Sequence, residues 1–351
     1  MTLKDLGIEH KAIDKQFVAF INFRGEISDI PAKIDELYEK IKKNVYSPAI
    51  AVIDYGVYTE GGKDIEICFP LKEEKDLKEV NTKYLDSVDV LSIMHRNSDD
   101  ALKESFQKIL EYRQEHVVLG TAWLRLVYHK YNQENPEDNM IEIQYNLHRW
   151  DKRLETSIDQ ILGSETRKEI MKDREKSFTI ESSYDDRIQW LKEMLDRLDQ
   201  ITNDDQKYEI LSRCAHDFSP KRIAYMKEIY QKTGNVDAVI KEMHKDNAWY
   251  EKPIRKGNKL YVSKVPVNQE GYDKAETLEE KKKNYCHCPF INENLDKGIS
   301  PTFCYCGTGW YRQQWEGIIE SPVKIKVLKS LLQGDDICQV EIILPSDVIK
   351  D

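Results

Sequence analysis

The sequence predicts an α+β protein of two domains. The first is a tandem strand–helix–strand–strand repeat that forms a curved sheet with a cleft, and the second is a helical and α/β domain with a cysteine cluster. Three observations lead to this prediction: an order of apolar segments that occurs twice before residue 150, a change to charged amphipathic helix after it, and four of the seven cysteines between Cys286 and Cys306. We place the domains at residues 1–155 and 156–351.

The first copy of the repeat begins with an apolar strand at 17–25 (FVAFINFRG). A helix follows, with Ser28 as the expected N-cap. Pro31 lies in its first turn, where the missing N–H leaves no hydrogen bond unmade. Two strands at 47–58 and 64–71, joined by a Gly-Gly turn, complete the copy.

The second copy has the same order of elements. A strand at 88–95 is followed by a helix that starts near Ser98, and strands at 121–131 and 139–147 close the copy. Because neither copy can bury its sheet alone, we expect the two copies to pair into one fold.

Both copies end in the tripeptide Ile-Glu-Ile, at 65–67 and 141–143. Alternate side chains of a strand share a face, so if the isoleucines face the helices, Glu66 and Glu142 point into the same groove. A carboxylate among aromatic rings suits an organic cation, and in a low-dielectric cleft its pKa would be raised, as a general acid or base requires. The alternative is that both glutamates are solvated on an outer face.

Residues 5–150 resemble the GyrI-like effector-binding domain of AraC- and MerR-type multidrug regulators, on the segments 17–25, 47–71 and 141–147. The resemblance implies a cleft that binds planar, aromatic and often cationic molecules through aromatic side chains and a buried glutamate. Some relatives are hydrolases of strained cyclopropane toxins, which would make a cleft glutamate the base and a tyrosine the acid. The candidate walls of the cleft are Tyr55, Tyr58, Trp123, Tyr128 and Tyr131.

Composition argues against several classes of protein. The net charge is −10 and no basic run exceeds Lys281–Lys283, so we expect no direct contact with nucleic acid. Only about a dozen residues precede the first predicted strand, so we expect no helix-turn-helix. Neither a signal peptide nor a membrane span is expected, because no apolar run is long enough. We therefore expect a cytoplasmic protein whose partner is a small aromatic or cationic molecule.

The middle of the chain is charged and helical in pattern. Apolar residues recur at helical spacing over 188–201 and again over 223–230, after a start at Ser219. The segment 172–186 has little periodicity, which predicts a loop or linker. Cys214 lies between two of the predicted helices.

Four cysteines form two Cys-x-Cys pairs, Cys286 with Cys288 and Cys304 with Cys306. In extended backbone each pair would present two sulfurs to one point, and four thiolates suit zinc or, as the alternative, an iron–sulfur cluster. Cys214 is a fifth candidate ligand. The competing interpretations are a redox or nucleophilic thiol site and a set of packed, reduced thiols.

The last hundred residues resemble 4-vinyl-reductase-type domains, with strands expected at 322–328 and 337–344 around a Gly-Asp-Asp turn and Cys338 on the final strand. In several relatives, cysteines near this point hold a metal. The sequence thus predicts a small-molecule-binding protein, either a sensor or a sequestering module, with a thiolate metal site. The alternatives are a hydrolase acting in the cleft and a metal- or thiol-dependent enzyme at the cysteine cluster.

Overall fold

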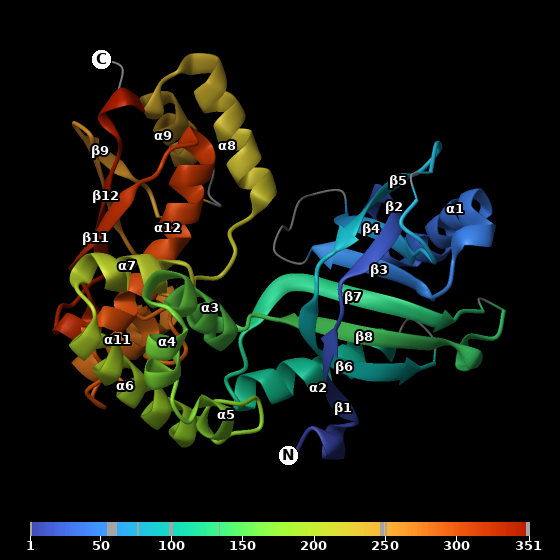
Figure 1. The fold of residues 1–351 in the computed structure, drawn as a ribbon, viewed down its shortest axis with the longest axis horizontal. Helices are drawn as coiled ribbons and strands as arrows, with labels where there is room; N and C mark the ends of the chain where they lie inside the picture. The colour runs from blue at the N-terminus through green and yellow to red at the C-terminus, as the bar shows by residue number, and fades with distance from the viewer. Residues whose placement is uncertain are drawn as a thin grey trace. The chain divides into compact units, whose positions relative to one another are not determined.

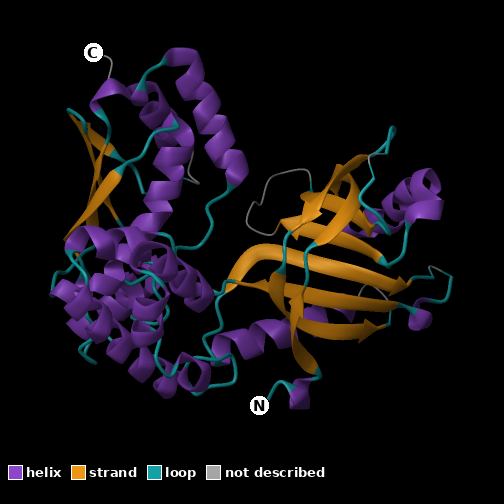
Figure 2. Ribbon diagram, in the orientation of Figure 1, coloured by secondary structure: helices purple, strands orange, loops and turns teal. Residues whose placement is uncertain are grey.

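The computed structural model describes residues 2–54, 62–75, 77–97, 101–132, 134–245, 249 and 251–348. The chain divides into two compact units, residues 1–149 and 150–351 (Figure 1). The boundary expected at 155/156 falls inside helix α3 (Trp150–Leu162). The predicted fold class is confirmed, because a large antiparallel sheet with helices is followed by a helical region with a second, smaller sheet (Figure 2).

The first unit contains an antiparallel sheet of eight strands in the order β1-β6-β8-β7-β3-β4-β2-β5. Its strands are β1 (Ile8–Ile13), β2 (Gln16–Gly25), β3 (Ala49–Asp54), β4 (Lys63–Pro70), β5 (Asn81–Leu85), β6 (Val88–Arg96), β7 (Gly120–Lys130) and β8 (Met140–Leu147). The six strands predicted from the repeat all form, and β3 and β7 join the two copies at the centre of the sheet. The strand order is therefore the same from either end, as expected for a repeat related by a two-fold axis.

The edge strands were not predicted. β1 precedes the first copy in sequence but pairs with β6 of the second copy, and β5 pairs with β2 of the first. Each of these strands is short and rich in polar residues, so the alternation of apolar and polar side chains that marks a strand is weak.

Helices α1 (Ile30–Ile41) and α2 (Leu102–Glu115) form near the predicted positions. The N-cap of α1 is Asp29 rather than Ser28. Ser28 instead lies in a 3₁₀ turn that a capping box between Glu26 and Asp29 closes. Because this turn satisfies the first free N–H groups, the α-helix begins later than expected. Ser98 lies outside the described residues.

The second unit combines helices with a four-stranded antiparallel sheet in the order β11-β12-β10-β9. Its main elements are α3, α4 (Ser164–Ile170), α5 (Arg174–Ser177), α6 (Tyr184–Ile201), α7 (Asp204–Ser212), α8 (Pro220–Thr233), α9 (Val236–Lys245), β9 (Ile254–Lys256), β10 (Lys259–Ser263), α10 (Gln269–Lys274), α11 (Leu278–Tyr285), α12 (Cys304–Ile319), β11 (Lys324–Lys329) and β12 (Gln339–Ile343). The predicted helices and C-terminal strands are confirmed. The expected loop at 172–186 is partly wrong, since it contains α5 and the first turn of α6, whose N-cap is Ser183.

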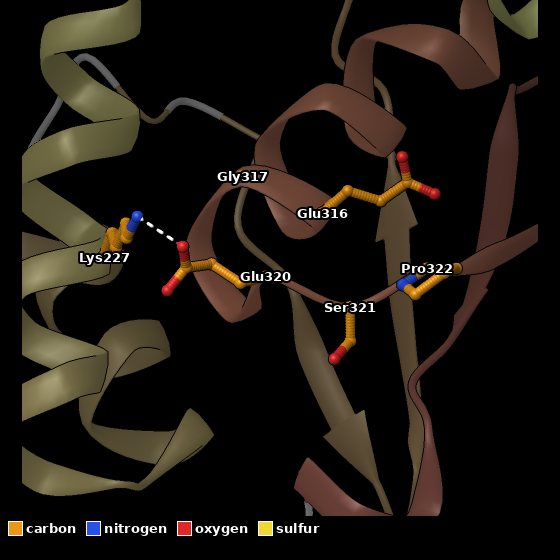
Figure 3. A pocket seen from close by; sticks show the side chains of 6 residues that line it. All are labelled: Lys227, Glu316, Gly317, Glu320, Ser321 and Pro322. Carbon is orange, nitrogen blue, oxygen red and sulfur yellow. Dashed lines mark hydrogen bonds and ion pairs between the residues drawn. The ribbon is translucent and has the colours of Figure 1, made fainter.

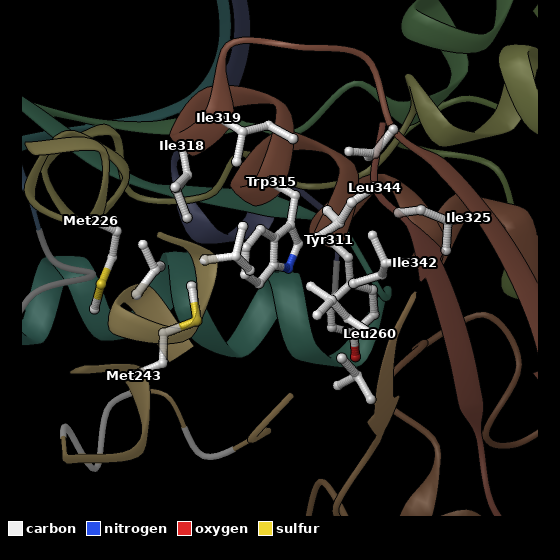
Figure 4. Close-up of a cluster of buried hydrophobic side chains, with 14 of the residues drawn as sticks. Met226, Met243, Leu260, Tyr311, Trp315, Ile318, Ile319, Ile325, Ile342 and Leu344 are labelled. Carbon is white, nitrogen blue, oxygen red and sulfur yellow. The ribbon is translucent and has the colours of Figure 1, made fainter. Parts of the chain in front are cut away.

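Helix α12 lies at the centre of the second unit. Its Trp315, 1% exposed, packs between Met226 of α8 and Ile342 of β12 in a large apolar cluster (Figure 4). The other side of α12 contacts α7 closely, because a Cβ atom added at Gly309 would lie 1.8 Å from the Ser212 carbonyl oxygen. A glycine is therefore required there. Among the described residues, we find no helix with the length and apolar character that crossing a membrane requires.

Candidate functional site

Helices α1 and α2 cover one face of the eight-stranded sheet. The ring of Tyr38 on α1 lies 5.8 Å from that of Phe69, and the ring of Phe106 on α2 lies 6.1 Å from that of Tyr145. Phe69 lies two positions after Ile67 on β4, and Tyr145 lies two positions after Ile143 on β8. Alternate side chains of a strand share a face, so Phe69 and Tyr145 share a face with the isoleucines of the Ile-Glu-Ile tripeptides. The isoleucines therefore face the helices, which is the condition under which the sequence places both glutamates on one face. Glu66 and Glu142 lie on the opposite face, which we call the glutamate face.

Two rows of side chains cross the glutamate face, and the pairing register gives their order. The first row is Phe20, Cys68, Ile50, Val127 and Glu142, and the second is Ser92, Gln144, Arg125, Val52 and Glu66. The two-fold relation of the repeat exchanges the rows. The first three positions are apolar in the first row (Phe20, Cys68 and Ile50) and polar in the second row (Ser92, Gln144 and Arg125).

The apolar part of the glutamate face is a packed cluster of five buried side chains. Its members are Val18, Ile50, Cys68, Leu85 and Val127. Phe20 and Val52 pack against it and remain partly exposed. The face thus combines an apolar area with buried polar groups, as small-molecule sites commonly do.

Glu142 is 6% exposed and fully engaged. Its carboxylate accepts hydrogen bonds from Ser92 Oγ (2.6 Å), Lys11 Nζ (3.1 Å) and His129 Nε2 (3.1 Å). Burial opposes ionisation, but these donors and Gln144 outweigh it and lower the pKa of Glu142 to about 2. The expectation of a raised pKa is therefore wrong for Glu142. A carboxylate of such low basicity is also a poor general base.

Glu66 has a different environment. Lys83 Nζ lies 2.7 Å from its carboxylate, and the Cys68 thiol donates to Oε1 at 3.3 Å. The ammonium of Lys83 also lies 4.8 Å from the centre of the Phe20 ring. Lys83 and Lys11 occupy equivalent positions on the two edge strands, opposite Val18 and Val90. The sequence prediction missed both lysines because it missed β1 and β5.

Arg125 lies in the middle of the glutamate face and is 6% exposed. Its Nη2 donates a long hydrogen bond of 3.4 Å to the Asp86 carbonyl oxygen. Within the described part of the chain, Nε and Nη1 have no acceptor, and no carboxylate forms an ion pair with Arg125. Burial lowers the pKa of the guanidinium, which still stays charged at neutral pH.

The predicted aromatic walls have different positions. Trp123 pairs with Asp54 and lies on the glutamate face, half-buried. Tyr128 pairs with Ala49 and Ile141, so its parity places it on the helix-covered face, and its assignment to the cleft is wrong. Tyr131 follows the end of β7, with its ring 5.8 Å from that of Tyr128. The remaining two candidates, Tyr55 and Tyr58, lie outside the described residues.

The cysteine cluster does not have the backbone expected for chelating pairs. Cys304 and Cys306 lie in the first turn of α12, where side chains two residues apart point about 200° apart. The prediction that this pair presents two sulfurs to one point is therefore wrong. Cys286 follows the end of α11 in extended conformation. Among the described residues, no group of three or more His, Cys, Asp or Glu side chains is arranged to hold a metal ion.

The thiols of the cluster are nevertheless neighbours. Burial raises the pKa of Cys288, and charges on Cys286, Cys306 and Cys304 raise it further. Burial also raises the pKa of Cys286 and of Cys306 to about 11, and that of Cys304 to about 12. These raised pKa values favour protonated thiols at neutral pH, which argues against the competing interpretation of a nucleophilic thiol site.

Two further cysteines adjoin this cluster. Cys214 is completely buried between α7 and α8. Burial is the main cause of its raised pKa, and the charge of Cys306 is the second. Cys338 immediately precedes β12, and its charge raises the pKa of Cys286 and of Cys304. The zinc or iron–sulfur site at these cysteines stays a prediction.

A surface pocket of about 470 Å³ lies in the second unit, between α8 and the end of α12 (Figure 3). Lys227 lies on one side of it and forms a 2.6 Å ion pair with Glu320. Glu316 accepts a hydrogen bond from Arg312 at 3.1 Å. Each charged group that lines the pocket therefore has a partner already, Lys227 and Glu320 in each other and Glu316 in Arg312 outside the pocket, so the pocket offers no free charge to a ligand.

Comparison with known proteins identifies the family of the chain. The profile of a family of unknown function (DUF6144) matches residues 148–349, more than half of the sequence. The chain belongs to this family. No curated protein matches the sequence. The resemblance of the last hundred residues to 4-vinyl-reductase-type domains stays a prediction.

Several solved structures have parts of similar fold. The C-terminal domain of EcmrR is 17% identical, with 40% of this chain and 96% of that chain covered and a TM-score of 0.35. SAV2435, solved bound to tetraphenylphosphonium, is 9% identical over 40% of this chain and 93% of its own, with a TM-score of 0.32. A hydrolase from Listeria innocua is 9% identical over 39% of this chain and 90% of its own, also with a TM-score of 0.32.

Proposed function

We propose that the protein binds a small organic cation with an aromatic or apolar body on the glutamate face. The observation that carries this proposal is the position of Lys83, whose ammonium lies 2.7 Å from the Glu66 carboxylate and 4.8 Å from the centre of the Phe20 ring. A carboxylate and a ring face around one ammonium are the contacts that an organic cation uses. The side chain of Lys83 is 39% exposed, so it can swing into solvent and leave its place to a ligand.

The surroundings of Glu66 supply the rest of such a site. Phe20 and Val52, which pack against the buried apolar cluster and remain partly exposed, offer an apolar surface to the body of the ligand. Glu142 is the weaker candidate, because three donors already occupy its carboxylate. Binding of this kind fits a sensor or a sequestering module, and the low pKa of Glu142 does not support hydrolysis with that residue as base.

The test is fluorescence anisotropy of rhodamine 6G, an aromatic cation, titrated with the whole protein. Glu66→Gln removes the negative charge and should weaken binding at least tenfold. Lys83→Met removes the competing ammonium and should tighten it. Glu104→Gln, at an exposed position of α2, is the matched control and should bind as the wild type does. Equal affinity in the wild type and both site variants would reject the proposal.

We propose zinc binding at the cysteine cluster as a second function, with an iron–sulfur cluster as the alternative. It is supported by the proximity of Cys288 to three other cysteines, whose charges raise its pKa. Zinc would have to deprotonate these buried thiols and draw them together around the ion. Metal content and the absorption spectrum of protein purified without oxygen are the test. About one zinc per chain supports zinc, iron with visible absorbance supports the cluster, and neither metal rejects both.

A further inference from the structure

The guanidinium of Arg125 is buried and forms no ion pair with the described residues. The charge of Asp86 raises its pKa, but by less than burial lowers it. Its carboxylate neighbours on the glutamate face are engaged elsewhere: Glu142 with Lys11 and His129, and Glu66 with Lys83. Within the described residues, its only hydrogen bond is the 3.4 Å contact from Nη2 to the Asp86 carbonyl oxygen. Charged side chains this buried are almost always paired, because removing an ion from water is unfavourable.

The fold itself does not require an arginine at this position. Arg125 is the two-fold equivalent of Ile50, since Val52 pairs with Glu66 and with Arg125, while Val127 pairs with Glu142 and with Ile50. Ile50 fills the same place in the other copy and is 5% exposed within the apolar cluster. The sheet thus accommodates an aliphatic side chain at the equivalent position, so the strand pairing by itself does not require a charged residue there.

We propose that Arg125 binds an anionic group, such as a carboxylate, phosphate or sulfonate, of a small molecule on the glutamate face. Nε and Nη1 supply the free N–H donors, and a planar guanidinium matches the geometry of these groups. The ligand's charge would then pair with the buried guanidinium. This inference rests on the proposed function, because it assigns a second contact to the same ligand-binding face.

The positions of the two contacts define the class of ligand. Arg125 on β7 and Glu66 on β4 lie in the same row with Val52 of β3 between them. Two strand spacings separate their backbones by roughly 10 Å. A ligand that uses both contacts therefore has an apolar body with a cationic group at one end and an anionic group at the other.

The experiment compares two fluorophores that share one aromatic body, 1-pyrenebutyrate and 1-pyrenemethylammonium, titrated with the whole protein. Arg125→Ile introduces the residue of the equivalent position, and Arg125→Met is a second variant if the first does not fold. We expect both to weaken pyrenebutyrate binding at least tenfold and to leave pyrenemethylammonium binding within twofold. Arg96→Met, at an exposed position of β6, is the matched control and should change neither affinity.

Three outcomes distinguish this inference from the proposed function. If pyrenebutyrate binds and the Arg125 variants lose it, the inference is supported. If pyrenemethylammonium binds but pyrenebutyrate does not, or binds equally well in the variants, the inference is overturned and the proposed function stands. If the wild type binds neither fluorophore, the proposed function fails and the inference fails with it.

Discussion

The Glu142 carboxylate makes a pH-dependent contribution to the stability of the first unit, and Glu142→Gln should remove it. Gln keeps the shape of the side chain but cannot ionise, so His129 loses its ion pair with Glu142 and Lys11 keeps only its ion pair with Glu9. We expect the variant to be less stable than the wild type at pH 7 and to lose less stability as the solution is acidified.

The size of this effect follows from the pKa of Glu142, which is about 2 in the folded protein against an ordinary value of 4.5. This difference corresponds to about 3 kcal/mol. A lowered folded-state pKa stabilises the fold fully above about pH 4.5, and the contribution is lost as pH falls towards 2. Because the side chains of Lys11 and His129 are 36% and 35% exposed, water screens part of it. We therefore expect the wild type to lose about 1 to 2 kcal/mol more than the variant between pH 7 and pH 3.

The assay is equilibrium unfolding in urea, with the thiol of Cys68 as the reporter for the first unit. Cys68 is the single cysteine of residues 1–149 and has no exposed surface in the folded state. A pulse of 4,4′-dithiodipyridine, which reacts with thiols in acid, labels it only where the unit is unfolded, and mass spectrometry separates its peptide from those of the other cysteines. Equal losses of stability in the wild type and Glu142→Gln between pH 7 and pH 3 would refute the reasoning.

Three further predictions concern stability and reactivity. Arg125→Ile should stabilise the first unit by about 1 kcal/mol or more, since it removes an unpaired buried charge, and a lower urea midpoint for Cys68 labelling would contradict this. Gly309→Ala should destabilise the second unit by about 3 kcal/mol or more, because its Cβ atom would lie 1.8 Å from a backbone oxygen. In Gly307→Ala, on the same helix, the added Cβ atom meets no atom within 4 Å, so this variant should be as stable as the wild type or more stable. Thermal unfolding of both variants tests the pair. Cys286, with a pKa of about 11, should react with iodoacetamide at pH 8 at least tenfold more slowly than free cysteine, and equal rates in peptide mass spectrometry would contradict its protonated state.

The sequence was sufficient to predict the glutamate face. The repeat of Ile-Glu-Ile gave the parity of β4 and β8, and parity decides the face of every side chain on a strand. It was not sufficient for the partners of the two glutamates. Lys11 and Lys83 belong to edge strands that pair with the other copy of the repeat, and a pairing between distant segments leaves no local pattern in the sequence.

The cysteine pairs show a second limit of local patterns. Cys304 and Cys306 precede Gly-Thr-Gly, a combination that favours a turn and therefore an extended pair of cysteines. The segment is helical because tertiary contacts override this preference. Gly309 allows α12 to approach α7 closely, and Trp315 then reaches the centre of the apolar cluster.

The difference between the two copies of the repeat explains why Glu66, and not its equivalent Glu142, is the better site for a ligand. Ser92 donates a 2.6 Å hydrogen bond to Glu142, and its equivalent in the first copy is Phe20, which cannot donate one. Compared with Glu142, the Glu66 carboxylate therefore has one internal hydrogen-bond donor fewer, and an aromatic ring lies beside the ammonium of its partner Lys83. Positions that are the same in both copies satisfy the fold, and the positions that differ give the glutamate face its apolar and its charged end.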